Sequence, residues 1–393
     1  MQNFRFSLTT NVLFGRGQVQ RLPAVLSGFG KKVLLTYGGG RIHKIGLYDT
    51  IMGLLAGFEV FELSGIDPNP KVESVEAGAR ICREKGIDVI LAVGGGSVID
   101  CSKAIAAAAF YDGPAWEMIM KASNFAGGAD AIRKALPLCT VLTLAATGSE
   151  VDSGAVISNS AEKVKTCMFS PLVVPKCSVL DPEYTYTVPA SQTAAGAADI
   201  LSHIFEVYFC HESTDIANGV AEGVMKTVIK NAPIALAQPD HYDARANLMW
   251  ASSVAMIGLC SSGNPGVPWS CHSMEHELSA YYDITHGVGL AILTPRWMRY
   301  ILSDATADKF AEFGINVWGI DASLNRMEIA ARAIDKTEEF FAALGLPKTL
   351  SELGIGQENL PAMAAHSVQT GGLAFAYVPL NEEDVVRIFK MCL

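Results

Sequence analysis

The 393-residue sequence lacks paired cysteines, long hydrophobic runs and an excess of basic residues. Its nine cysteines occur singly, with no C-x-x-C pair, which argues against a disulfide framework and against a zinc site built from thiolates. The longest unbroken apolar stretch is the eight residues 104–111, far below the roughly 20 that span a bilayer. With 40 acidic and 30 basic residues, the formal net charge of -10 offers no source for non-specific nucleic-acid binding.

The amino-terminal residues 1–18 contain neither a basic start followed by an apolar segment nor a cleavage site of the secretory type. We therefore expect the protein to stay in the cytoplasm and to bind neither membranes nor nucleic acids. Half of the residues are hydrophobic and only 18% are charged, which is typical of a compact globular chain. At about 150 residues per domain, the length predicts two sizeable domains.

Short apolar runs alternate with helical patterns over the first 190 residues. The runs, each rich in β-branched or leucine residues, lie at 31–37, 58–65, 87–97, 137–150 and 177–184. This alternation predicts an α/β domain with a mostly parallel sheet over residues 1–190. From Ser191 onward, alanine- and leucine-rich helical patterns follow without convincing strands, which predicts an all-helical domain over residues 191–393.

One predicted strand runs directly into a glycine-rich turn and then into a helical pattern. The strand 87–93 ends at Gly94-Gly95-Gly96-Ser97, and Asp100 follows in the expected helix. This order suits phosphate binding, because glycines let the backbone approach an anion and the start of a helix supplies free N–H groups. A plain tight turn is the alternative for one such segment. It is not the G-x-G-x-x-G fingerprint of ordinary dinucleotide-binding folds.

Two further strand ends carry the same kind of residues. Gly38, Gly39, Gly40 and Arg41 follow a strand at 33–36, and Ala145-Ala146-Thr147-Gly148-Ser149-Glu150 follows a strand at 141–144. Ligands of open α/β sheets bind at the carboxyl ends of the strands. Three such ends therefore predict one long phosphate-bearing ligand, a nucleotide cofactor.

An aspartate and a histidine share one face of a predicted helix. Asp199 and His203 are four residues apart, so both side chains can reach one metal ion from adjacent turns. A surface salt bridge is the alternative. The flanking Ala, Ile, Leu and Phe residues instead predict a buried helix, in which an unpaired carboxylate would be costly.

Three more histidines occur close together further along the chain. His272 and His276 are again four residues apart, and His286 follows a predicted turn. A carboxylate and three imidazoles suit a divalent first-row metal, and the absence of cysteine ligands favours a catalytic over a structural site. Core histidines without a metal are the alternative.

With these residues in hand, the chain resembles the iron-containing alcohol dehydrogenase family, and within it the branch of NADPH-dependent butanol dehydrogenases and broad-range aldehyde reductases. The resemblance runs essentially from end to end and rests on four motifs: GGGSVID at 94–100, ATGSE at 146–150, the D-x-x-x-H of Asp199 and His203, and HSMEHELSAYYDITHG at 272–287. It implies a Rossmann-like dinucleotide-binding domain followed by a helical metal-binding catalytic domain, a dehydroquinate synthase-like architecture.

The resemblance also implies the residues of the site. One divalent metal, Fe²⁺ or Zn²⁺, would be held by Asp199, His203, His272 and His286. His276 would lie near the nicotinamide and carry the catalytic proton, as suits an imidazole. The implied cofactor positions are Gly38, Gly39, Gly40, Arg41, Gly94, Gly95, Gly96, Ser97, Asp100, Thr143, Thr147 and Lys165.

The implied cofactor is NADP(H). Gly39 stands where NAD-dependent relatives carry an acid, and Arg41 follows it, which favours a 2′-phosphate on the ribose. One departure concerns the nicotinamide side, where many relatives have two consecutive threonines and this chain has Thr143-Leu144. That departure removes a side-chain contact from position 144.

The activity implied by the resemblance is that of an NADP-dependent alcohol dehydrogenase or aldehyde reductase, which transfers hydride between NADP(H) and a primary alcohol or aldehyde such as butanol or butanal. A homodimer is also implied, formed through the apolar segment 4–8. The alternative is a lyase or cyclase of the dehydroquinate-synthase kind with transient nicotinamide redox chemistry; a non-catalytic metal- or nucleotide-binding protein is a third reading. Between residues 199 and 287 the only basic residues are Lys226, Lys230 and Arg245, which favours an uncharged substrate.

Overall fold

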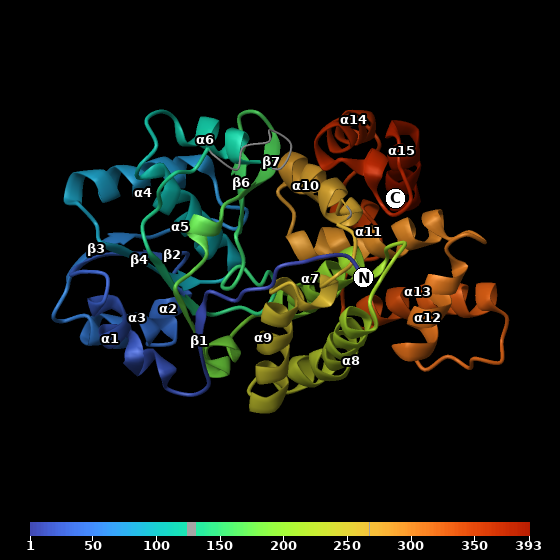
Figure 1. The fold of residues 1–393 in the computed structure, drawn as a ribbon, viewed down its shortest axis with the longest axis horizontal. Helices are drawn as coiled ribbons and strands as arrows, with labels where there is room; N and C mark the ends of the chain where they lie inside the picture. Colours follow the sequence, from blue (N-terminus) through green and yellow to red (C-terminus); the bar gives the residue numbers. More distant parts are fainter. Residues whose placement is uncertain (124–130, 267) are drawn as a thin grey trace. The chain divides into compact units, whose positions relative to one another are not determined.

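The computed structural model describes residues 1–123, 131–266 and 268–393, and these form two compact units (Figure 1). The first, here called the α/β unit, comprises Ser7–Val188 and Asp240–Ser253. The second, the helical unit, comprises Met1–Phe6, Pro189–Pro239 and Val254–Leu393. Within the described residues, none of the helices has the length and apolar character needed to cross a membrane.

The α/β unit is built on a six-stranded sheet in which every neighbouring pair is parallel. The strand order is β1-β8-β5-β4-β2-β3. The strands are β1 (Asn11–Phe14), β2 (Lys32–Tyr37), β3 (Glu59–Leu63), β4 (Val89–Gly94), β5 (Leu138–Leu142) and β8 (Cys177–Leu180). The predicted parallel sheet is confirmed, and β1 is an additional edge strand that the sequence analysis did not identify.

Helices of the α/β unit connect these strands. They are α1 (Leu22–Ser27), α2 (Arg41–Lys44), α3 (Leu47–Leu54), α4 (Val72–Lys85), α5 (Gly96–Ala108) and α6 (Ala115–Ala122). The central strand β4 is buried at every residue, as expected for a parallel strand covered on both faces. The edge strand β3 contains only exposed and half-buried residues, in keeping with its position.

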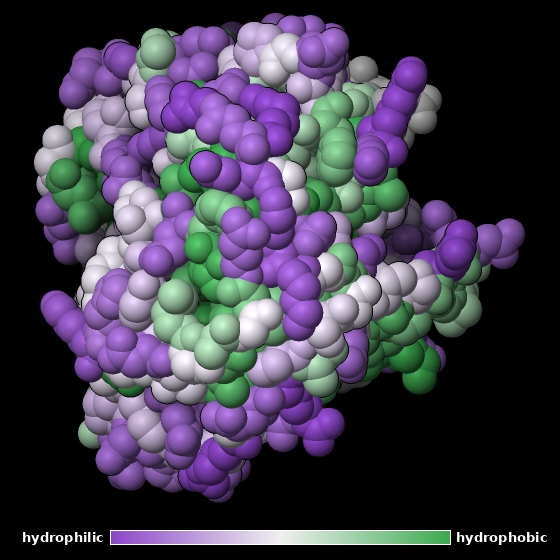
Figure 2. All heavy atoms as spheres, turned by 90° about the vertical axis from the view of Figure 1, so that its left-hand side faces the viewer, coloured by the Kyte–Doolittle hydropathy of each residue, from purple (hydrophilic) through white to green (hydrophobic). Residues whose placement is uncertain are grey.

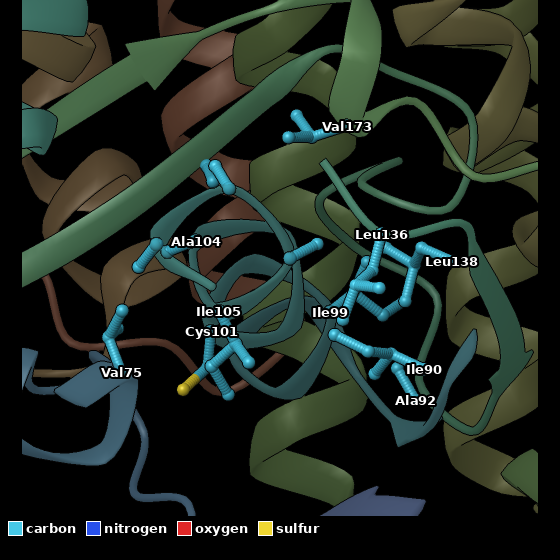
Figure 3. Close-up of a cluster of buried hydrophobic side chains, with 14 of the residues drawn as sticks. Val75, Ile90, Ala92, Ile99, Cys101, Ala104, Ile105, Leu136, Leu138 and Val173 are labelled. Atoms are coloured by element: carbon cyan, nitrogen blue, oxygen red, sulfur yellow. The ribbon is translucent and has the colours of Figure 1, made fainter. Parts of the chain in front are cut away.

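The core on one face of the sheet surrounds α5 (Figure 3). Alanines and small side chains fill most of this helix, so nearly all of its residues are buried. The figure shows side chains of α5 beside those of α4, β4 and β5; among them are Val75, Ile90, Ala92, Ile99, Cys101, Ala104, Ile105 and Leu138. Because α5 begins directly after β4, this packing fixes the turn between them.

A two-stranded antiparallel hairpin accompanies the main sheet. It consists of β6 (Gly154–Asn159) and β7 (Val164–Phe169), which pair along their whole length. The sequence analysis did not identify this hairpin. It packs against α5, and its β7 strand carries the buried Lys165.

The helical unit contains the long helices predicted for the second half of the chain, and that prediction is confirmed. They are α7 (Ala190–Tyr208), α8 (Asp215–Ala237), α10 (Ser270–Tyr282), α11 (His286–Ile301), α12 (Ala307–Asn316), α13 (Arg326–Ala343), α14 (Leu360–Gly371) and α15 (Glu382–Met391). The remaining helix, α9 (Tyr242–Met256), lies mainly in the α/β unit, where its Met249 joins the core.

The surface at the left-hand side of Figure 1 belongs to the region of β3 and α4. In Figure 2 hydrophilic residues predominate on this face, and hydrophobic residues form scattered patches between them. Scattered apolar residues are normal for a protein surface.

Candidate metal centre and candidate dinucleotide-binding edge

The metal centre predicted from the sequence begins on α7. Asp199 and His203 lie one turn apart on this buried, alanine-rich helix, as their spacing predicted, and Nε2 of His203 is 3.4 Å from Oδ1 of Asp199. Both side chains are almost fully buried. A carboxylate in such surroundings is costly unless a cation or hydrogen-bond donors neutralise it.

Two other helices bring the remaining imidazoles to the same oxygen. His272 lies in the first turn of α10 and His286 begins α11; their Nε2 atoms are 3.8 Å and 3.6 Å from Oδ1 of Asp199. Gly287 makes this approach possible, because a Cβ at that position would collide with the backbone carbonyl oxygen of Ala195 on α7. Helices α7 and α11 therefore pack in direct contact beside the site.

The four side chains present the donor set of a divalent metal. Three imidazole Nε2 atoms converge on one carboxylate oxygen. Within the described part of the chain, both Oδ1 of Asp199 and Nε2 of His272 are buried without a hydrogen-bond partner. Ligand atoms placed tetrahedrally around a metal at about 2.1 Å stand roughly 3.4 Å apart, close to the separations observed. The residues present fit a metal ion.

The electrostatics of this cluster support the same interpretation. Burial alone would raise the pKa of Asp199, but the surrounding imidazoles hold that pKa below its usual range. Burial lowers the pKa of His203 to about 3, so this imidazole is neutral, as a metal ligand must be. Burial also acts to lower the pKa of His272, but the carboxylates of Asp199 and Glu206 outweigh it and raise that pKa to about 9, so without a bound cation this imidazole keeps a proton that a metal would displace.

Two buried glutamates that the sequence analysis missed lie behind the imidazoles. Glu206 on α7 accepts from Nδ1 of His272 at 3.1 Å, and Glu275 on α10 pairs with Nδ1 of His286. One signal was available in the sequence. Glu206 follows His203 by three residues in an otherwise apolar helix, where an unpaired acid would be costly.

His276 lies beside this cluster but not among the atoms that face Asp199. Its ring centroid is 5.8 Å from that of His286, and its ring nitrogen groups with Glu275 and His286 instead of with Asp199. The side chain is half-buried. His272 and His276 lie four residues apart on α10, yet of these two only His272 approaches the Asp199 carboxylate.

The second candidate site lies in the α/β unit, at the carboxyl edge of the sheet. From β2 the chain passes outward to β3 and then returns to β4, so the strand order reverses between β2 and β4. Such a switch point is where open α/β sheets bind ligands. Tyr37 is in register with Val93, which places the glycines after β2 and those after β4 at the same level.

Glycine is sterically required where β4 turns into α5. A Cβ at Gly94 would lie 2.5 Å from Cγ2 of Val98, and one at Gly96 would collide with the side chain of Thr147. The first turn of α5 starts at Gly96; the backbone N–H groups of Val98 and Ile99 donate to the carbonyl of Gly95, which leaves those of Gly96 and Ser97 without a partner within the helix. They form the kind of N-terminus that binds phosphate.

Residues that follow β5 lie against the same turn. Thr143 follows β5 and donates its backbone N–H to the carbonyl of Gly94 at 2.9 Å. Leu144 lies beside Gly95, since a Cβ there would be 3.1 Å from Cβ of Leu144. Gly39 differs from Gly94, because a Cβ at position 39 would meet no atom within 4 Å. The edge thus has open space beside β2.

Arg41 and Asp100 already have partners within the α/β unit. The Arg41 guanidinium donates to the carbonyl oxygens of Thr143, at 3.1 Å, and Tyr184. Asp100 accepts from Ser149 Oγ at 2.5 Å and from a backbone N–H of β6 at 2.9 Å, and burial raises its pKa to about 6. Both side chains therefore hold neighbouring segments of this edge together. Their contact with a cofactor stays a prediction.

Comparisons with known proteins cover the whole chain. The family models described as iron-containing alcohol dehydrogenase and as the C-terminal part of the Fe-containing alcohol dehydrogenase family match residues 9–182 and 193–393. The chain is 50% identical over 395 residues to NADH-dependent butanol dehydrogenase B of Clostridium acetobutylicum, covering 99% of each chain. It is 38% identical over 367 residues to NADPH-dependent aldehyde reductase YqhD of Escherichia coli, covering 92% of each.

A solved structure shows the same architecture. The crystal structure of NADH-dependent butanol dehydrogenase A from Thermotoga maritima superposes with a TM-score of 0.92 at 36% identity, covering 100% of this chain and 99% of the other. The similarity therefore extends over both units, including the helices that carry the histidine cluster and the strands that carry the glycine-rich turns.

Proposed function

The chain belongs to the iron-containing alcohol dehydrogenase family, and from this premise we propose that it interconverts aldehydes and primary alcohols with a nicotinamide dinucleotide and a divalent metal. The observation that carries the proposal is the convergence of three imidazole Nε2 atoms on Oδ1 of Asp199. The helical unit would be the metal-binding catalytic domain. The α/β unit would be the dinucleotide-binding domain.

The proposed ligands are Asp199, His203, His272 and His286, and the proposed metal is Fe²⁺ or Zn²⁺. When bound, the metal supplies a Lewis acid at the substrate oxygen and the nicotinamide supplies or accepts hydride. At equal availability such a donor set favours zinc over ferrous iron, so the metal found in the cell follows availability.

The remaining residues bind and orient. The N–H groups at the start of α5, beside Gly96 and Ser97, bind the pyrophosphate of the dinucleotide. Thr143 and Thr147 lie on the proposed nicotinamide side, and Lys165 serves the ribose or phosphate. The imidazole of His276 holds the proton that the product alcohol gains and exchanges it with solvent, a role that its half-buried position suits.

The substrate we propose is an uncharged aldehyde such as butanal. The ring of Trp269 lies 4.9 Å from that of His272 and 5.6 Å from that of His203, measured between centroids, so an aromatic surface borders the metal centre. The metal motifs contain no lysine or arginine. A lyase of the dehydroquinate-synthase kind would need several cationic side chains for its phosphate and carboxylate substrates, and the names of the relatives likewise favour an oxidoreductase.

For the cofactor we propose NADPH in preference to NADH, on the ground of Gly39. A glycine there leaves room for the 2′-phosphate and carries no carboxylate to repel it. The Arg41 guanidinium is committed to Thr143 and Tyr184, so we assign Arg41 to bracing the strand ends. Relatives of both kinds exist: NADH-dependent butanol dehydrogenase B is 50% identical to this chain and NADPH-dependent aldehyde reductase YqhD is 38% identical, so both cofactors are measured.

The test begins with anaerobically purified protein, freed of metal and reloaded with Fe²⁺ or Zn²⁺. Oxidation of NADPH and of NADH is then followed with butanal and a panel of other aldehydes. We expect turnover only after one of the metals is restored. Absence of aldehyde-dependent oxidation with every metal would contradict the proposal and favour a non-catalytic binding protein.

A further inference from the structure

Two of the three imidazoles that face Asp199 have a carboxylate behind them, and the third does not. Nδ1 of His272 is bonded to Glu206 and Nδ1 of His286 to Glu275. Nδ1 of His203 is buried and finds no hydrogen-bond partner among the residues that the structure describes. The cluster is therefore asymmetric in its outer contacts, although its three Nε2 atoms face the same oxygen.

Glu206 holds both the backbone and the ring of His272. Its Oε1 accepts from the backbone N–H of His272 at 2.8 Å and from Nδ1 of the ring at 3.1 Å. The residue before α10, Trp269, provides no side-chain cap. Glu206 thus caps the helix that carries the imidazole and orients the imidazole itself, and its side chain is 3% exposed.

Glu275 orients the ring of His286 in the same way, but other contacts hold it in place. Its Oε2 pairs with Nδ1 of His286, and its Oε1 accepts from the Ser279 hydroxyl one turn along α10. Gly289 on α11 makes room for it, because a Cβ there would lie 2.8 Å from Cγ of Glu275. The Glu275 side chain is fully buried.

The chemistry of these contacts determines which ring nitrogen is free. In the neutral ring that binds a metal, the carboxylate accepts the Nδ1 proton, so Nε2 is the nitrogen without a proton and its lone pair is directed toward Asp199. The negative charge behind the ring also makes Nε2 a more basic donor. His203 lacks this support; its ring is held by stacking on His272, with centroids 4.8 Å apart and planes inclined by 18°.

From this arrangement we infer that Glu206 and Glu275 are positioning residues for the metal, which fix the tautomer and orientation of His272 and His286 and raise the affinity of the site. The inference rests on the metal centre of the proposed function. Removing the charge of either glutamate weakens metal binding by about 10- to 100-fold.

The test uses Glu206→Gln and Glu275→Gln, which keep the size of the side chain and remove its charge. Glu277→Gln is the matched control: Glu277 is also a buried glutamate of α10, and its Oε1 bonds Nδ1 of His366 at 2.7 Å, outside the metal cluster. Metal-free full-length protein is titrated with Zn²⁺ against a chelator. Co²⁺ then serves as a spectroscopic probe of ligand geometry through its visible absorption.

We expect both test variants to bind Zn²⁺ about 10- to 100-fold more weakly than the wild type and to shift the Co²⁺ absorption, and the control to do neither. Circular dichroism of the metal-free proteins reports folding. Should Glu206→Gln fail to fold because α10 loses its cap, Glu275→Gln alone decides.

The metal centre and the role of the two glutamates are tested separately. If the wild type binds no stoichiometric metal, the metal centre of the proposed function is wrong, and this inference with it. If the wild type binds metal and the folded Gln variants match it in affinity and in Co²⁺ spectrum, the inference alone is overturned. An equal loss in Glu277→Gln would also overturn it, because the effect would then follow from any buried charge on α10.

Discussion

Nε2 of His286 lies 3.6 Å from Oδ1 of Asp199, although the two residues belong to different helices. The contact depends on Gly287, the residue after the histidine, where any side chain would collide with the carbonyl oxygen of Ala195. The geometry of the cluster is therefore set by the packing of α11 on α7. A donor lost from either helix removes part of one shared site.

Replacing His272 or His286 with Ala is expected to remove bound metal and activity together, because a four-donor site that loses one donor binds its metal far more weakly. The glycine-rich edge belongs to the α/β unit, so dinucleotide binding should persist. Metal analysis and a titration of NADPH fluorescence measure the two properties. Full metal content with normal turnover in either variant would remove that histidine from the ligand set.

For His276→Ala we expect metal content to persist while the rate falls and its pH dependence flattens, as suits a proton carrier that does not bind the metal. The placement of the ring supports this division, since it lies near His286 without facing Asp199. The measurement is kcat as a function of pH beside a metal analysis of the same sample. Loss of the metal would instead identify His276 as a ligand.

Most features that depend on residues close together in the sequence were predicted. The spacing of Asp199 and His203 fixed their common face, and the strands before Gly38, Gly94 and Thr143 were identified because buried parallel strands are continuous apolar runs. The choice between His272 and His276 is different. The two histidines lie four residues apart on one face of α10, so the sequence alone does not separate them. The packing of α10 against α7 determines which one meets the Asp199 carboxylate.

The features that were missed depend on tertiary contacts. The hairpin of β6 and β7 has no regular alternation of apolar and polar residues, so periodicity did not indicate it. The sequence does not name the partners of Glu206 and Glu275, because each glutamate meets an imidazole from another helix. The bonds of Asp100 to Ser149 and to β6 were likewise not predicted, and its contact with a cofactor stays a prediction.

Glu150 should make stability depend on pH. It is fully buried, its Oε1 accepts from Ser253 Oγ at 2.5 Å, and burial raises its pKa to about 7 from 4.5. The folded state therefore retains a proton that the unfolded state releases, so this contribution to stability is present below about pH 4.5 and is lost as the pH rises through about 7. The total is on the order of a few kcal/mol.

Glu150→Gln is expected to flatten the decline in unfolding free energy between these pH values. Denaturant unfolding at a series of pH values from 5 to 8 measures it, and Glu84→Gln, at an exposed position of α4, is the control. An unchanged pH dependence in Glu150→Gln would show that Glu150 does not take up a proton in this range.

We also expect a homodimer formed through the amino-terminal segment. Phe4, Phe6 and Leu8 are 56%, 45% and 42% exposed and lie in a stretch without helix or strand. Apolar extended segments invite pairing with a second chain. Light scattering should give twice the single-chain mass, and Phe4→Ser with Phe6→Ser should lower it. A wild-type mass near 41.9 kDa at micromolar concentration would contradict the prediction.

The preference for NADPH is expected to depend on Gly39. The backbone there accepts a side chain without a clash, since nothing lies within 4 Å of its Cβ position. An aspartate at 39 would accept the 2′-hydroxyl of NADH and repel the phosphate of NADPH. Gly39→Asp should therefore reverse the order of preference, and Gly39→Asn, which has the same size without the charge, should change it much less.

This reversal should appear in KM for the cofactor with little change in kcat, because the adenosine ribose is remote from the hydride and its contacts bind ground state and transition state alike. The measurement is kcat/KM for NADPH and NADH in the wild type and both variants. The Asn variant separates charge from bulk, so equal effects of Asp and Asn would assign the preference to the shape of the turn. Equal use of the two cofactors by the wild type, or an unchanged ratio in Gly39→Asp, would show that position 39 does not select the cofactor.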